Sequence, residues 1–312
     1  MEYRELGLTG LRVSRLGFGC WAIGGHGYGQ VNDEESIRSI RKALDLGINF
    51  FDTADVYGFG HSEEILSKAL GSERKKVVVA TKFGISWDLG GKTFKDCSPK
   101  RIEEALEGSL KRLRLDSVPL YQIHWYDGVT PIPEIMMTLR KCQEAGKIQH
   151  IGCSNFSSDL ILEFLSVKPM ESLQTLFNMI ENDSEPEILR LSNELRIGVI
   201  VYGVLARGLL TGKYGRDSKF GEGDTRSRDQ NFQGKRLKAF LRVAEELKRI
   251  GLLYYKTPSQ VAIRWVLENE HITCALTGIK DSKQVEDNVQ ALGWRLSPKD
   301  RALISAIAKE AV

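Results

Sequence analysis

Short runs of apolar residues alternate with amphipathic segments along the whole chain. Eight of these runs predict near-continuous apolar strands, which are typical of parallel strands buried on both faces. The segments between them carry apolar residues at helical spacing, as Ile37, Ile40 and Leu44 do before Gly47. The expected strands cover residues 15–21, 48–53, 77–83, 118–125, 148–154, 173–178, 198–205 and 273–278.

Eight such units in succession predict an α/β fold with a single (β/α)8 TIM barrel, formed by residues 1–312 as one domain. Ser98-Pro99 and Thr257-Pro258 are typical helix starts, and Ser297-Pro298 predicts an additional C-terminal helix. The segment around Thr9-Gly10 predicts an N-terminal β-hairpin that plugs the lower end of the barrel.

Two segments predict loops rather than regular structure. The connection from Ala206 to about Gly234 is rich in Gly, Arg, Asp and Ser, and a loop of this length is usually either disordered or functional. We therefore expect either disorder or a cover over a bound ligand. The glycine-rich residues 25–29, which include Tyr28, predict a flexible loop at the barrel mouth, within reach of a substrate.

Charge and cysteine content point toward small-molecule chemistry. Lys and Arg number 44 against 41 Asp and Glu and are interleaved with them, so no basic patch indicates nucleic acid or a membrane surface. The five cysteines are odd in number and form no CxxC pair, which is typical of reduced thiols. No signal segment and no apolar run of roughly 18 residues is present, so we expect a cytoplasmic location. The sequence does not indicate an oligomeric state.

Ionisable residues follow three consecutive expected strands. These residues are Asp52, Lys82 and His124, and the carboxyl ends of barrel strands face one mouth, where active sites are built. Tyr57 lies in the loop after the second strand and can fold over the same mouth. The sequence therefore predicts that these four side chains meet.

The four side chains suit reversible proton transfer to a carbonyl oxygen. A phenol alone is a poor acid at neutral pH, but a lysine ammonium beside Tyr57 favours phenolate, and Asp52 keeps Lys82 charged. His124 can hydrogen-bond the substrate carbonyl or relay the proton. No nucleophile is evident, so we expect the electrons to come from a cofactor.

At these residues the sequence resembles the aldo-keto reductase superfamily, in the branch that includes bacterial general aldo-keto reductases and potassium-channel β-subunits. The resemblance covers nearly the whole chain and implies reversible hydride transfer from NADPH to an aldehyde or ketone, with Tyr57 as the proton donor. The motifs that carry it are Phe51-Asp52-Thr53-Ala54 with Tyr57-Gly58, Ala80-Thr81-Lys82, Ile123-His124-Trp125, the run from Ile151 to Phe156 and the run from Gly208 to Tyr214.

The same resemblance implies the cofactor site. Ser154, Asn155 and Gln174 would hold the carboxamide, and Tyr202 would stack on the nicotinamide ring. Lys213 and Lys280 offer cations for a 2′-phosphate, which favours NADPH over NADH. Phosphate and adenosine contacts would come from Leu205, Arg207, Leu209, Lys213, Gly278, Lys280, Gln284, Asp287 and Asn288.

Three tryptophans follow strands one, three and four and are candidates for the substrate pocket: Trp21, Trp87 and Trp125. Ordinary core or rim packing is the alternative for each of them. The five histidines are scattered and have no paired ligand spacing, so we expect no metal site.

The alternative hypothesis is a cofactor-sensing binding subunit like the channel β-subunits. The resemblance implies Asn in such subunits where this chain has His124, and little sequence precedes Tyr3, so we expect an enzyme. A lyase or isomerase on the same barrel would leave the cofactor motifs unexplained.

Overall fold

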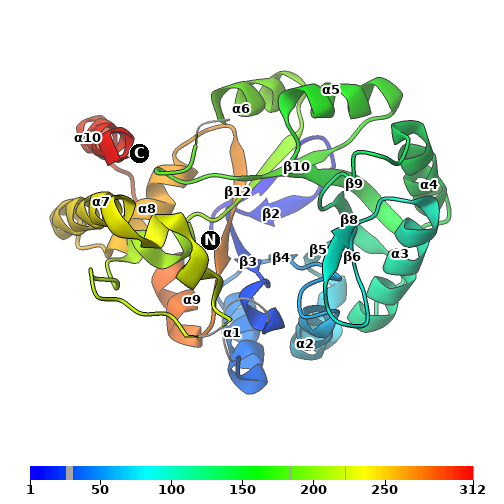
Figure 1. Cartoon of the computed structure of the whole chain (residues 1–312), viewed down its shortest axis with the longest axis horizontal. Coiled ribbons are helices and arrows are strands. Elements are labelled where there is room, and N and C mark those ends of the chain that lie inside the picture. The colour runs from blue at the N-terminus through cyan, green and yellow to red at the C-terminus, as the bar shows by residue number, and fades with distance from the viewer. Residues whose placement is uncertain (26–30, 183–184, 222, 312) are drawn as a thin grey trace.

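Eight parallel strands form a closed barrel in the computed structural model of the chain, which describes residues 1–25, 31–182, 185–221 and 223–311. Each strand pairs with the next, and the last strand pairs with the first, with helices around the outside (Figure 1). The predicted (β/α)8 barrel is therefore confirmed. The barrel strands are β3 (Leu16–Gly19), β4 (Phe50–Asp52), β5 (Val78–Phe83), β8 (Val118–Ile123), β9 (Ile148–Ser154), β10 (Ser172–Leu176), β11 (Gly198–Tyr202) and β12 (Ile272–Gly278).

The outer helices begin where the sequence supplies capping side chains. Ser98 accepts a hydrogen bond from the backbone N–H of Arg101, and Thr257 forms a reciprocal capping box with Gln260. The predicted C-terminal helix is present as α10. The helices are α1 (Asp33–Asp45), α2 (His61–Leu70), α3 (Pro99–Leu113), α4 (Ile132–Glu144), α5 (Ser158–Val167), α6 (Glu185–Glu194), α7 (Gly234–Tyr254), α8 (Pro258–Leu267), α9 (Ser282–Val289) and α10 (Pro298–Ala311).

The predicted N-terminal hairpin is formed by β1 (Tyr3–Glu5) and β2 (Arg12–Ser14). Leu6 and Val13 are fully buried and belong to the same apolar cluster as residues of the barrel strands. The hairpin therefore plugs the lower end of the barrel, as the sequence predicts.

Alternation along the strands explains how the mouth becomes polar. Phe50, Ala80 and Leu120 share the cluster inside the barrel, whereas Phe51 and Val79 pack outward against helices. Because side chains alternate between faces, the inward positions two residues further on are Asp52, Lys82 and Gln122. A polar layer thus lies directly above the apolar interior.

Two segments lie over the mouth (Figure 1). The first is a hairpin of β6 (Ile85–Trp87) and β7 (Thr93–Lys95), which the sequence did not predict. The second is the long connection after Ala206, which contains three short turns of 3-10 helix. Tyr214, Phe220 and Phe232 pack edge to face there, with centroids 5.0–5.6 Å apart, so aromatic contacts order the described part of this segment. The 3-10 turns are η3 (Ala206–Thr211), η4 (Thr225–Arg228) and η5 (Gln230–Phe232).

Candidate active site

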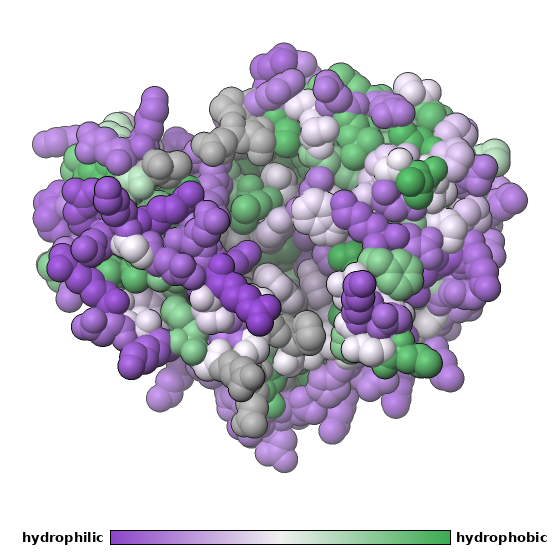
Figure 2. Space-filling model, in the orientation of Figure 1, coloured by the Kyte–Doolittle hydropathy of each residue, from purple (hydrophilic) through white to green (hydrophobic). Residues whose placement is uncertain are grey.

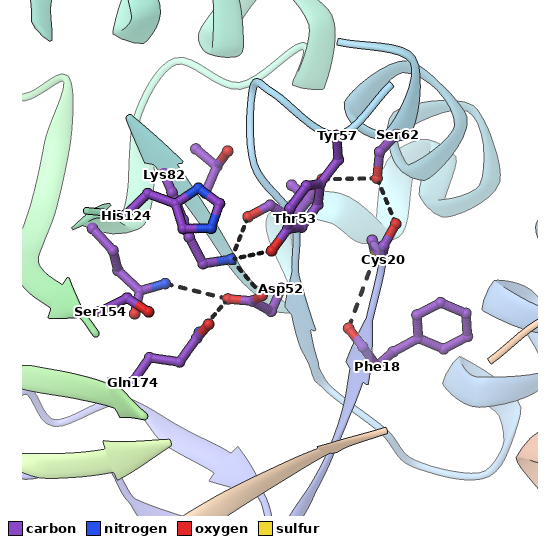
Figure 3. Close-up of polar contacts among 12 residues, drawn as sticks. Phe18, Cys20, Asp52, Thr53, Tyr57, Ser62, Lys82, His124, Ser154 and Gln174 are labelled. Atoms are coloured by element: carbon purple, nitrogen blue, oxygen red, sulfur yellow. Dashed lines mark hydrogen bonds and ion pairs between the residues drawn. The ribbon is translucent and has the colours of Figure 1, made fainter. Parts of the chain in front are cut away.

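Lys82 is the centre of a hydrogen-bonded group at the barrel mouth (Figure 3). Its ammonium donates to Asp52 Oδ1 at 2.6 Å, to the backbone carbonyl of Thr53 at 2.8 Å and to Tyr57 Oη at 3.5 Å. The side chain of Lys82 is completely buried. A buried ammonium needs such compensation, and here the third acceptor is the phenol itself.

The Asp52 carboxylate is held on its other side by two amides. Gln174 Nε2 donates to Asp52 Oδ2 at 2.7 Å, and Gln122 Nε2 donates to the same oxygen at 3.2 Å. The two amides thus hold Oδ2 while Oδ1 accepts from the Lys82 ammonium, so the carboxylate is fixed from both sides. Sequence reasoning missed Gln122, although its position two residues before His124 on the inward face could have revealed it.

Tyr57 is placed by a tight turn after β4. Gly58 has φ of +60°, and a Cβ atom at this position would lie 2.1 Å from the carbonyl oxygen of Gly24. Only glycine therefore fits beside the phenol. The preceding backbone is anchored because Thr53 and Ser62 join their hydroxyls at 2.9 Å.

His124 packs edge-on against the Tyr57 ring, with centroids 5.6 Å apart. Burial and the nearby Lys82 ammonium hold the pKa of His124 well below its usual value of 6.5, so the imidazole is neutral at neutral pH. Its Nδ1 is buried and has no partner among the residues that the structure describes. The four predicted catalytic residues are thus brought together.

The residues expected to hold the carboxamide lie on the adjacent strands. Tyr202 donates to Asn155 Oδ1 at 2.6 Å, and Asn155 Nδ2 donates to Ser154 Oγ and to the carbonyl of His124. Burial raises the pKa of Tyr202 to about 12, so this phenol stays neutral. Asn155, Ser154 and Gln174 form a compact set of amide and hydroxyl groups that fits a carboxamide.

The residues expected at the phosphates gather around the ends of β11 and β12. Burial, followed by the positive charge of Arg226, lowers the pKa of Lys280, and Lys213 contributes in the same direction. Arg226 was not predicted, because nothing in the sequence distinguishes it from the other arginines of its loop. The Asp224 carboxylate pairs with Arg226 and acts on the pKa of Lys280 in the opposite direction. The region still holds three cations against this one carboxylate, so it fits a phosphorylated cofactor.

The remaining residues predicted to contact the cofactor fall into three groups: residues paired with other side chains, residues at the mouth, and residues with buried side chains. Arg207 pairs with Asp229 at 2.5 Å, Gln284 donates to Asp281 at 2.9 Å, and Asp287 accepts from Gln260 at 2.7 Å. Leu205 and Gly278 lie beside the mouth at the ends of η3 and β12. The side chains of Leu209 and Asn288 are buried in the protein.

The three candidate tryptophans have different neighbours, and one of them contacts Tyr57. Trp21 stacks on the Tyr57 ring with centroids 6.3 Å apart, Trp87 packs on Phe59, and the Lys95 ammonium lies 5.0 Å from the Trp125 ring centre. Figure 2 shows this face hollowed at its centre within a largely hydrophilic rim. Residues 26–30, including Tyr28 of the predicted glycine-rich loop, lie outside the described residues.

Neither a metal cluster nor a membrane-spanning helix occurs in the described part of the chain. Its His, Cys, Asp and Glu residues form no group of three or more that could hold a metal ion. None of its helices is long and apolar enough to cross a membrane.

A barrel with a buried lysine, a tyrosine, an aspartate and a neutral histidine at its mouth defines a class of carbonyl-reducing oxidoreductases. The model of the aldo/keto reductase family matches residues 15–309, and the chain belongs to this family. It is accordingly an enzyme that reduces carbonyl groups with a nicotinamide cofactor.

Three similar proteins illustrate the relationship. The aldo-keto reductase YhdN of Bacillus subtilis is 38% identical over 315 residues, covering 100% of this chain and 95% of the relative. The NADH-specific methylglyoxal reductase of Escherichia coli is 34% identical and covers 99% of both chains. The solved glycerol dehydrogenase AKR11B4 of Gluconobacter oxydans is 38% identical, with a TM-score of 0.91 over 99% of this chain and 96% of that one.

Proposed function

We propose that the chain is an NADPH-dependent reductase of aldehydes or ketones in which Tyr57 donates the proton. The observation that supports this best is the 3.5 Å contact between the Lys82 ammonium and Tyr57 Oη, with Asp52 completing the chain of contacts. The positive charge stabilises the phenolate that remains after proton donation. The cofactor, when bound, supplies the hydride.

His124 orients the carbonyl in this proposal. A neutral imidazole can donate one hydrogen bond to the carbonyl oxygen without competing with Tyr57 for the proton. The low pKa of His124 supports this role, since a protonated imidazole beside Lys82 would add a second buried cation. In the reverse direction the same contact holds the alcohol oxygen near the Tyr57 phenolate.

The preference for NADPH rests on the cations near the end of β12. Lys280, Lys213 and Arg226 provide the charge that a 2′-phosphate would meet, and NADH lacks this phosphate. Ser154, Asn155, Gln174 and Tyr202 hold the nicotinamide end. The Escherichia coli relative is named as NADH-specific, so cofactor choice varies among similar chains.

We further propose that the whole chain acts as one domain in the cytoplasm. All five cysteines are free and buried, which supports a reducing compartment. Trp21, Trp87 and Trp125 line the substrate pocket in this proposal.

Tyr57→Phe tests the proton donor. We expect NADPH binding to be unchanged and turnover of an activated aldehyde to fall by about 10²–10⁴-fold. Turnover is followed by the absorbance of the reduced nicotinamide, and binding by fluorescence titration. Tyr126→Phe is the matched control, because this half-buried phenol donates to Thr130 away from the group. A fully active Tyr57→Phe enzyme would remove Tyr57 from the mechanism.

A further inference from the structure

Arg101 joins three parts of the mouth that come from different elements. It lies in the first turn of α3, and its guanidinium pairs with the Asp55 carboxylate, two residues before Tyr57. It also donates to the carbonyl of Ile85 at 3.0 Å and lies 5.1 Å from the centre of the Trp87 ring. One side chain therefore contacts both the loop that carries Tyr57 and the hairpin over the mouth.

The partner of Arg101 is almost completely buried. Asp55 is 1% exposed, and burial raises its pKa to about 7, an effect that the Arg101 guanidinium opposes. A planar guanidinium can bind a carboxylate, donate to a carbonyl and face an aromatic ring at the same time, which a lysine ammonium cannot do. The geometry around Arg101 is thus specific to arginine.

The Trp87 ring also touches the Tyr57 loop directly. Phe59 follows Tyr57 by two residues, and its ring centre lies 5.3 Å from that of Trp87. Phe59 is 37% exposed and Trp87 is half-buried, so each ring retains an open surface. Together they form an aromatic wall between the hairpin and the loop that carries Tyr57.

Tyr57 itself has anchors that do not involve Arg101. Its loop is held by the bond from Lys82 to the Thr53 carbonyl and by the close approach of Gly58 to Gly24. Trp87 lies on a short hairpin instead, where Arg101 supplies a fixed contact. Removing Arg101 should therefore shift Trp87 more than the phenol of Tyr57.

We propose that Arg101 is a positioning residue for specificity: it holds Trp87 against Phe59 and so favours carbonyl substrates that carry a planar aromatic group. This inference rests on the proposed function. Arg101 is not a catalytic residue, because its contacts are to Asp55, Ile85 and Trp87.

The test compares two aldehydes, para-nitrobenzaldehyde and propanal, with the NADPH-loaded protein. For Arg101→Met we expect KM for the aromatic aldehyde to rise about fivefold, the effect of losing one aromatic contact. Both kcat and KM for propanal should stay within about twofold, because Tyr57 is anchored independently. Equal changes for both aldehydes, or no change for either, would overturn the inference.

Two further substitutions distinguish a loss of Trp87 positioning from a general loss of stability. Arg101→Lys keeps a positive charge beside Asp55, so compared with Arg101→Met it should recover the wild-type melting temperature. It should not recover the wild-type KM for para-nitrobenzaldehyde. Trp87→Leu should reproduce the selectivity loss, and adding Arg101→Met to it should change KM by less than about twofold, because the two residues act together. Additive effects would show that Arg101 does not act through Trp87.

Arg112→Met is the matched control. Arg112 lies on the same helix and pairs at 2.7 Å with Glu63, which is fully buried, so its loss should lower stability without altering selectivity. Altered selectivity here would contradict a specific role for Arg101.

The role of Arg101 can also be measured in a protein that proves not to be a reductase. A wild-type protein that reduces neither aldehyde would refute the proposed reductase. Binding of para-nitrobenzyl alcohol, read by quenching of tryptophan fluorescence, then reports on the wall without turnover. Arg101→Met should weaken this binding about fivefold. An unchanged dissociation constant would overturn the role of Arg101.

Discussion

Replacing Lys82 with Met removes the positive charge beside Tyr57. At the observed 3.5 Å, an ammonium and a phenolate attract each other by roughly 5 kcal/mol at an effective dielectric constant of about 20. Asp52, 2.6 Å from the ammonium, offsets part of this attraction. A remaining effect of about 3–4 kcal/mol corresponds to a rate factor of about 10²–10³.

The same substitution also leaves a carboxylate without its cation. Asp52 is 3% exposed, and removing one partner of a buried ion pair costs about 3–5 kcal/mol of stability. The double variant Asp52→Asn with Lys82→Met removes both charges and should recover much of this stability. Its activity should stay low, because the ammonium beside Tyr57 is still missing.

The assay measures aldehyde reduction at neutral pH and alcohol oxidation across a range of pH. Oxidation requires the Tyr57 phenolate, so without the ammonium the oxidation profile should move to higher pH. Denaturant unfolding gives the stability of both variants. A Lys82→Met enzyme that folds and reduces aldehydes at the wild-type rate would refute the reasoning, as would an unshifted oxidation profile.

Three other substitutions test separate parts of the structure. The pKa of His124 is depressed in the folded state, so below pH 6.5 the unfolded chain binds a proton at His124 that the folded chain does not bind, and the wild-type protein loses stability as the pH falls. Between pH 6.5 and 5, His124→Asn should therefore lose less unfolding free energy than the wild type, by up to about 1.4 kcal/mol per pH unit in urea unfolding. Lys280→Met should weaken the binding of NADPH about tenfold and the binding of NADH little. Equal losses of affinity for the two cofactors in fluorescence titration would exclude a contact between Lys280 and a 2′-phosphate. Leu6→Ala should cost about 2–5 kcal/mol of unfolding free energy with kcat unchanged, and an unaltered stability would show that the hairpin does not plug the barrel.

The fold could be predicted from sequence because its signals are local. Continuous apolar runs such as Val78–Phe83 report burial on both faces, and Ser98 and Thr257 mark helix starts through their own side chains. Strand β6 was missed because Ile85–Trp87 is only three residues long, too short for its alternation to stand out. It pairs with Thr93–Lys95, and a contact between separate segments leaves no local pattern in the sequence.

The position of the predicted catalytic residues at one mouth could also be derived from the sequence. Asp52, Lys82 and His124 each end or follow a strand, and a barrel brings all such positions to one mouth. Gln122 could have been found by the same alternation, since it lies on the inward face two residues before His124. Arg226 and Arg101 carried no signal, because one arginine in a loop or helix looks like any other.

The sequence by itself thus determined the barrel, its hairpin plug and the strand that each predicted catalytic residue ends or follows, because these depend on hydrophobic period and residue order. Tertiary structure alone decided the distances: Lys82 to Tyr57 at 3.5 Å, two amides on Asp52, and Arg101 between Asp55 and Trp87. Charge interactions depend on separation and burial, and both arise only when distant segments pack together.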